Sequence, residues 1–311
     1  MFTRAVLVIG ALLAQASEAP KPVALPCAWE KGAHFSMDLT KSKERWQHGK
    51  ILSNQATVTP IDFEVVDKTK DGYVFRWTLH KSTVVAGETN PMTDPMAEIM
   101  NGVAIDFVAD AQGTVVSIVA QEKLESEVAK RIDLLAKDLA NKGMSADEVA
   151  SFCRILAPSF RGANWHAALM NEPKIFTMPS GATLVVGEKR AYESWLPNPF
   201  GGAMLPAKAC LELRSVDKDK HEAIVEWRQT VDSDKASPIL EASVRATAKR
   251  TGQELPAEAS LSFDTIEDAT TYVYDLTTGW PKSVVWSRSS TMAGVRTIDG
   301  HRFDVRTTAT K

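Results

Sequence analysis

The chain holds few residue spacings that are typical of a catalytic site. The segment SVDK (residues 215–218) matches the Ser-x-x-Lys pattern of enzymes that form a covalent acyl-serine. In this chain the segment stands where a strand meets a predicted hairpin loop, not at the start of a helix. It also lacks the Ser-Asp-Asn and Lys-Thr-Gly companions of that pattern. We therefore predict no catalytic residue and a protein that is not an enzyme.

Metal-ligating residues are equally sparse. No two histidines stand four positions apart on a predicted helix, and no cysteine pair has the spacing of a zinc site. We predict no metal and no cofactor. Three histidines could still converge in space on a zinc ion, so a hydrolase with a dispersed site stays as an alternative. The six histidines are His34, His48, His80, His166, His221 and His301.

The eight tryptophans are better candidates for binding residues. Trp46 and Trp77 recur as Trp195 and Trp227 in an internal repeat described below. Repeated large aromatic residues on strands usually anchor equivalent positions in two cores; the alternative is that they line a sugar- or lipid-binding groove. Trp280 stands at the tip of a predicted hairpin. We therefore expect it to be exposed and to contact a ligand or partner.

The segment WLPNPFGGAMLP (residues 195–206) is a loop of unusual chemistry. It carries no charged side chain, and its prolines and glycines exclude a helix or a regular central strand. The equivalent connection after Trp46 is mostly polar. We therefore expect Phe200, Met204 and Leu205 to make a contact specific to this loop. The functional alternatives are a contact with a ligand or with a partner protein. The internal alternative is a contact with the helices of residues 122–156.

The elements that position these residues form an internal repeat. LTKSKERW (39–46) matches EKRAYESW (188–195), and VDKTKDGYVFRW (66–77) matches VDKDKHEAIVEW (216–227) without a gap. Further on, ADAQGTVVSIV (109–119) resembles YDLTTGWPKSVV (274–285). The three blocks occur in the same order in both halves, which indicates a duplication. The repeats span residues 34–121 and 173–311.

Within each half, apolar and polar residues alternate with the period of a half-buried strand. Each half also contains one helix, over 95–101 and 238–251, that begins with a proline and ends before a glycine. Asp299-Gly300 predicts a further hairpin turn. An amphipathic segment and a Ser145/Glu148 capping box predict a helical connector over 122–172. The predicted fold is α+β, with two homologous antiparallel sheet halves joined by a helical hairpin.

The first residues have the features of an export signal. A positive charge, a short apolar run and a small-residue cleavage site predict a signal peptide over 1–16. Residues 17–33 are predicted to be an extended tether, and the mature chain has no transmembrane segment. We expect a periplasmic or secreted protein. Of the three cysteines, Cys27 and Cys210 are the predicted disulfide pair in that oxidising compartment. The net charge of −3 gives no support for nucleic-acid binding.

The hairpin YDLTTGWP, in a duplicated chain with a signal peptide, resembles those of uncharacterised bacterial envelope proteins built from antiparallel sheet. A curved antiparallel sheet with helices on one face is also similar in architecture to the periplasmic lipoprotein carriers. Those proteins hold acyl chains between the sheet and the helices. The resemblance implies an envelope protein that binds an apolar or amphipathic ligand such as a lipid. The alternative is a structural or protein-interaction module of the envelope.

Overall fold

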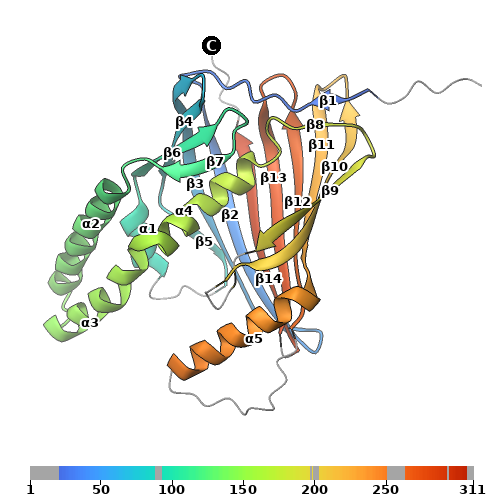
Figure 1. The fold of residues 1–311 in the computed structure, drawn as a ribbon. Coiled ribbons are helices and arrows are strands. Elements are labelled where there is room, and N and C mark those ends of the chain that lie inside the picture. Colours follow the sequence, from blue (N-terminus) through green and yellow to red (C-terminus); the bar gives the residue numbers. More distant parts are fainter. Residues whose placement is uncertain are drawn as a thin grey trace, which may run out of the picture.

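The computed structural model describes residues 21–87, 93–196, 198, 203–250, 263–292 and 294–306. One strongly curved antiparallel sheet dominates it (Figure 1). The order across the sheet is β7-β6-β4-β3-β2-β14-β13-β12-β11-β10-β9, with β5 beside β3. The strands are β2 (His34–Gln47), β3 (Lys50–Thr69), β4 (Gly72–Leu79), β5 (Thr83–Ala86), β6 (Val103–Asp110), β7 (Val115–Ile118), β9 (Lys189–Leu196), β10 (Leu205–Asp217), β11 (Glu222–Val231), β12 (Phe263–Asp275), β13 (Trp280–Met292) and β14 (Val295–Arg306).

The mixed helix and strand content and the large antiparallel sheet confirm the predicted fold class in outline. Both predicted halves contribute to this one sheet. The last strand, β14, pairs with β2 and thereby joins the second half to the first. The chain therefore forms a continuous surface, on which residues from both halves can face the same side.

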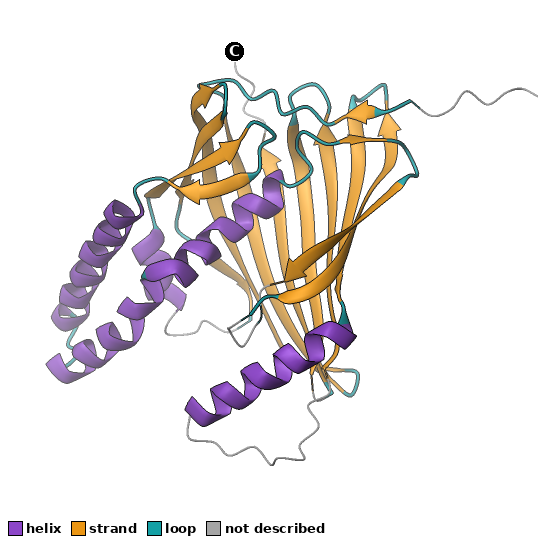
Figure 2. Ribbon diagram, viewed as in Figure 1, coloured by secondary structure: helices purple, strands orange, loops and turns teal. Residues whose placement is uncertain are grey.

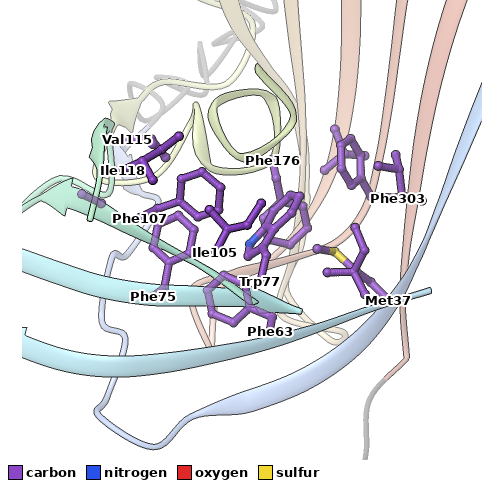
Figure 3. Close-up of a cluster of buried hydrophobic side chains, with 14 of the residues drawn as sticks. Met37, Phe63, Phe75, Trp77, Ile105, Phe107, Val115, Ile118, Phe176 and Phe303 are labelled. Carbon is purple, nitrogen blue, oxygen red and sulfur yellow. The ribbon is translucent and has the colours of Figure 1, made fainter. Parts of the chain in front are cut away.

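The helix α4 (Gly162–Thr177) crosses the concave face of this sheet (Figure 2). Its Phe176 is fully buried and points into an aromatic cluster that includes Phe63, Trp77 and Phe303 (Figure 3). Alternation along the strands supplies this cluster, because every second residue of a strand faces the same side of the sheet. The aromatic part of the core thus lies between α4 and the strands β2, β3, β4, β6 and β14, and the same core continues onto β10, β11, β12 and β13.

Two polar contacts hold α4 in place. The Tyr272 hydroxyl donates a hydrogen bond of 2.9 Å to the carbonyl of Ile175. That carbonyl lies in the last turn of the helix, and residue 179, four positions on, is a proline without an N–H group. Nearly one turn earlier in the helix, Glu172 forms an ion pair of 2.5 Å with Lys41 of β2.

The predicted connector contains α2 (Gln121–Asn141), α3 (Ala146–Leu156), a short 3-10 turn η1 (Ala157–Phe160) and α4. The Ser145/Glu148 capping box is present as predicted. The apolar stripe of α2 is buried. None of the described helices combines the length and the apolar character that a membrane crossing needs.

Two local predictions are wrong. The helix α1 (Thr93–Met100) lies close to its predicted position, but α5 (Ser233–Arg250) starts five residues before Pro238. Asp232 is its N-terminal cap, because its backbone carbonyl accepts from Ala236 N–H and its carboxylate from Lys235 N–H. Asp299-Gly300 forms no turn, since β14 runs straight through it.

The described part of the predicted tether is packed into the protein. A short strand β1 (Val23–Ala24) pairs with β8 (Thr183–Leu184). Leu25 and Trp29 are almost completely buried. The Trp29 indole stacks on Trp280 at a centroid distance of 4.1 Å and donates a hydrogen bond to the carbonyl of Gly279. Residues 1–20, with the predicted signal peptide, lie outside the described residues.

The predicted disulfide is not formed, since all three cysteines are free thiols. Cys27 belongs to the docked N-terminal segment and packs against Gly113, whereas Cys210 lies in β10 between β9 and β11. Burial raises the pKa of the Cys27 thiol to about 11. This thiol is therefore neutral and poorly reactive at physiological pH.

Candidate ligand-binding pocket

A pocket of about 160 Å³ opens beside α4, over the second half of the sheet. We call it the tryptophan pocket, because Trp195, Trp227 and Trp286 all line it. Polar groups from β11, β12 and β13 form its floor, and α4 forms its roof. The other lining residues are Asn171, Lys174, Ile175, Met178, Leu196, Gln229, Asp268, Thr270, Tyr272 and Arg288.

The strand register brings the lining residues together. Thr270 of β12 pairs with Trp227 on one side and with Trp286 on the other. Two residues along, Asp268 pairs with Gln229 and with Arg288. Cross-strand neighbours lie on the same face of the sheet, so these residues form two adjacent rows under α4.

An ion pair forms one part of the floor. The Arg288 guanidinium donates two hydrogen bonds, of 2.7 and 2.8 Å, to the Asp268 carboxylate. The guanidinium also lies 5.5 Å from the centroid of the Trp286 ring. Asp268 is only 3% exposed. This fork-to-fork geometry neutralises both charges locally, and it holds Arg288 in one orientation.

Thr270 forms the other part of the floor, and it is incompletely satisfied. It is 2% exposed, and its hydroxyl oxygen is out of reach of a water-sized group. The hydroxyl lies beside that of Tyr272 without meeting hydrogen-bond geometry. Leaving a buried hydroxyl without a full partner costs about 1–3 kcal/mol. Thr270 is therefore part of the packed base of the pocket.

The three tryptophans of the pocket walls differ in solvent exposure. Trp286 is buried, Trp227 is half-buried, and Trp195 is 61% exposed at the sheet edge. The Trp227 indole N–H donates a 2.8 Å hydrogen bond to the hydroxyl of Tyr192 on the edge strand β9. Lys174 of α4 is exposed at the mouth. The pocket therefore has a polar floor, aromatic walls and an aromatic lip.

A second polar cluster lies next to the pocket. The imidazole of His301 is 4.7 Å from the Trp286 ring and lies in the row that contains Lys41. Burial lowers the pKa of His301 to about 4, so the ring is neutral at pH 7. Its Nδ1 atom is buried and has no partner within the part of the chain that the structure describes. This cluster continues the polar strip beneath α4.

The predicted contact residues do not come together. Trp280 is half-buried by its stack on Trp29, so its predicted exposure is wrong. It lines a separate pocket of about 400 Å³ that also contains Phe35 and Lys282. The two pockets share no lining residue.

The loop after Trp195 contacts the protein's own helix α5. Leu205 is completely buried in a small core with Leu240, so its predicted role in an external contact is wrong. The Asn198 amide donates to the Ser243 hydroxyl of α5. Met204 is 45% exposed, and Phe200 lies outside the described residues. The described loop residues thus contact α5, and not the helices of residues 122–156.

The repeated tryptophans divide between core and pocket. Trp77 is a core residue as predicted, whereas Trp195 and Trp227 line the pocket. The sequence analysis missed Thr270, Asp268 and Arg288. These three residues stand in strands with the usual alternation of side chains, and no spacing in the sequence distinguishes them from other polar strand residues.

Two further kinds of grouping are relevant to catalysis within the part of the chain that the structure describes, a Ser-Asp-His cluster and clusters of possible metal ligands. The Asp62 carboxylate accepts from the Ser36 hydroxyl and contacts the His80 ring, so the aspartate stands between the serine and the histidine. A catalytic triad needs the histidine in that position. Within the described residues, no three His, Cys, Asp or Glu side chains are grouped to hold a metal ion. A comparison of the sequence with protein-family models and one with curated proteins each found no match.

Proposed function

We propose that this protein is a binding protein whose ligand is amphipathic and occupies the tryptophan pocket. The observation that carries the proposal is an open pocket that three tryptophans line together with the polar side chains of Asn171, Lys174 and Arg288. Binding pockets are typically aromatic with a few placed polar groups, and this pocket has both. Both chemical characters in one pocket suit a ligand that has an apolar surface and a polar surface.

The position of α4 supports this choice. The helix packs Phe176 against β3, β4 and β14, and leaves an opening between its own side chains and those of β9, β11, β12 and β13. The polar contacts at Ile175 and Glu172 fix the helix in this position. The pocket is therefore a feature of the packed fold.

Export to the periplasm or the cell exterior is part of the proposal, and so is a role without catalysis. The support is the signal-like sequence of residues 1–16 and the pocket's similarity in kind to a site between sheet and helices. An envelope lipid, or another apolar molecule with a polar group, is the expected partner.

We further propose that the two halves arose by duplication and that α2 and α3 form the hairpin joining them. Equivalent hairpins support this. Asp110 accepts hydrogen bonds from the backbone of its turn, and Asp275 does the same in the second half. Gly113 and Gly279 both have positive φ angles, of 83° and 75°, and both lie against the segment 26–29.

The test is a pair of measurements. The purified protein is extracted, and the extract is analysed by mass spectrometry for co-purified lipid. Binding of a fluorescent hydrophobic probe is then compared for wild type, Trp195→Ala and Trp46→Ala. Trp46 is the control, because it is the repeat equivalent on β2 and does not line the pocket. We expect only Trp195→Ala to weaken binding. An empty extract together with no micromolar probe binding would exclude the function.

A protein-interaction module is the second candidate, and the exposed edge strand β9 favours it. Tyr192 and Trp195 are 42% and 61% exposed there. A partner at this edge would contact Trp195 but would not reach Trp286, which is buried at the inner end of the pocket wall. Trp286→Phe therefore separates the two functions, since only ligand binding in the pocket depends on that ring.

A further inference from the structure

The strand β9 leaves one of its edges open. It is the last strand of the large sheet (Figure 1), and within the described residues it pairs only with β10. We infer that this edge pairs antiparallel with the same strand of a second copy, so that two molecules share one continuous sheet. This assembly is independent of ligand binding in the tryptophan pocket. It also names an occupant for the edge on which the second candidate function relies.

The side chains of β9 leave this edge accessible to solvent. Of its eight residues, all but Ser194 and Leu196 are exposed, so the strand is uncovered on both faces. Its backbone N–H and C=O groups on the open side form a template for another strand. Proteins usually block such a template with a proline, a bulge or charged side chains. The described strand has no proline and pairs with β10 in an unbroken register, so its charges decide whether a second strand is repelled.

Symmetry fixes which residues face each other. Two copies of a strand that pair antiparallel in one sheet are related by a two-fold axis normal to the sheet. Residues equally far before and after the axis then lie opposite each other on the same face. With the axis at Ala191, Lys189 lies opposite Glu193 of the second copy, and Arg190 lies opposite its Tyr192. Each of these two pairs occurs twice in the assembly.

The charges along the strand match this axis. Lys189 and Glu193 are exposed, and neither belongs to an ion pair among the described residues. In the register with β10, Lys189 lies opposite Glu212, and Glu193 lies opposite Lys208. The row that crosses both copies therefore alternates in sign at every step, through Glu212, Lys189, Glu193 and Lys208. Opposite charges on facing strands stabilise their pairing, whereas like charges destabilise it.

The other face of the strand is complementary as well. The Tyr192 ring is 42% exposed, and its hydroxyl is held by the Trp227 indole N–H. The Arg190 guanidinium is exposed and donates a hydrogen bond of 2.8 Å to the carbonyl of Thr183. In the paired strands each guanidinium lies beside the tyrosine ring of the other copy, which is a favourable cation–π arrangement. The second copy therefore covers an aromatic ring that one copy alone leaves largely exposed.

The alternative axes lack this match. An axis at Arg190 or at Glu193 would place that charged residue opposite itself. An axis at Tyr192 would place Glu193 opposite Ala191 and Lys189 opposite an indole, with no ion pair between the copies. The other terminal strand of the sheet, β7, has only four residues, so it offers β9 fewer backbone groups than a second β9 does. Ala191 is therefore the position that pairs opposite charges.

The experiment measures self-association of the purified protein by analytical ultracentrifugation, from micromolar to submillimolar concentrations. We expect the wild type to form a dimer. Lys189→Glu and Glu193→Lys should each weaken it roughly tenfold or more, because each change places two like-charged pairs at the interface. An equimolar mixture of the two variants should form a heterodimer with about the affinity of wild type, since each variant then meets the opposite charge on the other.

Lys70→Glu is the matched control, because it makes the same change of charge in the exposed turn between β3 and β4. It should dimerise like wild type. Circular dichroism checks the fold of each variant. Recovery of the dimer in the mixture shows that the charge reversals leave β9 able to pair.

Three results overturn the inference. A wild type that stays monomeric at every concentration excludes the second copy, and leaves the edge to a different protein. A dimer that both charge reversals leave unchanged uses another surface. A mixture that associates as weakly as each variant alone shows that Ala191 is not the axis. Binding of the hydrophobic probe is measured on the same samples, so the proposed function stands or fails separately.

Discussion

Thr270→Val should make the unliganded protein more stable. Valine has nearly the shape of threonine, but it has a methyl group in place of the hydroxyl. The wild-type hydroxyl is buried with no partner among the residues that the structure describes, a condition that costs about 1–3 kcal/mol. Removing it should raise the free energy of unfolding by about 2 kcal/mol. Most single substitutions destabilise a protein, so the sign of this change is itself informative.

Equilibrium unfolding in urea, followed by circular dichroism, measures the change. The slope of the free energy against urea should be equal in wild type and variant, because the surface exposed on unfolding is the same. Thr271→Val should change the stability by less than about 0.5 kcal/mol, as expected for an exposed strand residue.

A loss of stability in Thr270→Val would refute this reasoning. It would show that the hydroxyl makes a stabilising hydrogen bond within the folded protein. The neighbouring Tyr272 hydroxyl is the partner that such a result would indicate. An unchanged stability would show that burying the hydroxyl has no net cost, and the reasoning would fail with it.

The remaining predictions concern stability and thiols. Arg288→Met should lower the free energy of unfolding in urea by about 3–5 kcal/mol, because it leaves the Asp268 carboxylate buried without its cation. The double variant with Asp268→Leu should recover most of that loss. A double variant as unstable as Arg288→Met would contradict this. The pKa of His301 is lowered from 6.5 to about 4, so the unfolded chain binds the proton first. The contribution of His301 to the free energy of unfolding should be present above pH 6.5, and the free energy should fall by about 2 kcal/mol between pH 7 and pH 5. If His301→Phe keeps the wild-type dependence on pH, this histidine is not its cause. Trp29→Ala should lower the free energy of unfolding by about 3–5 kcal/mol, since its indole is buried and stacked. A loss below about 1 kcal/mol, measured by thermal or urea unfolding, would support the extended tether that the sequence predicted for residues 17–33. Thiol titration of the denatured, unreduced protein should find three thiols, and finding one would re-establish the disulfide.

Local chemistry was predictable wherever the responsible residues are neighbours in the chain. The capping box at Ser145 forms from residues three apart. The turns after Asp110 and Asp275 form because each carboxylate accepts from backbone N–H groups two or more positions on. Alternation of apolar residues places Phe63 in the core for the same local reason.

Predictions failed where a distant segment competes with the local signal. Asp299-Gly300 has the residues of a hairpin turn, but β13 and β2 pair with both edges of this stretch and keep it extended. A Cβ atom at Gly300 would lie 2.5 Å from the Ser42 hydroxyl, so the glycine permits a close approach of two strands. Trp280 has the position of an exposed hairpin tip, but Trp29 covers it from 251 residues earlier in the chain.

The sequence by itself thus determined the presence of the strands and helices, the turns after Asp110 and Asp275, and the antiparallel class of the sheet. These follow from side-chain period and backbone chemistry over a few residues. Only the tertiary structure decided that both halves form one curved sheet, that α4 packs on its concave face, and that the pocket opens beside α4 on that same face. The tryptophan pocket draws on β9, β11, β12, β13 and α4, and its members meet because of strand register and helix docking. Those contacts join residues far apart in the chain, so no local spacing encodes them.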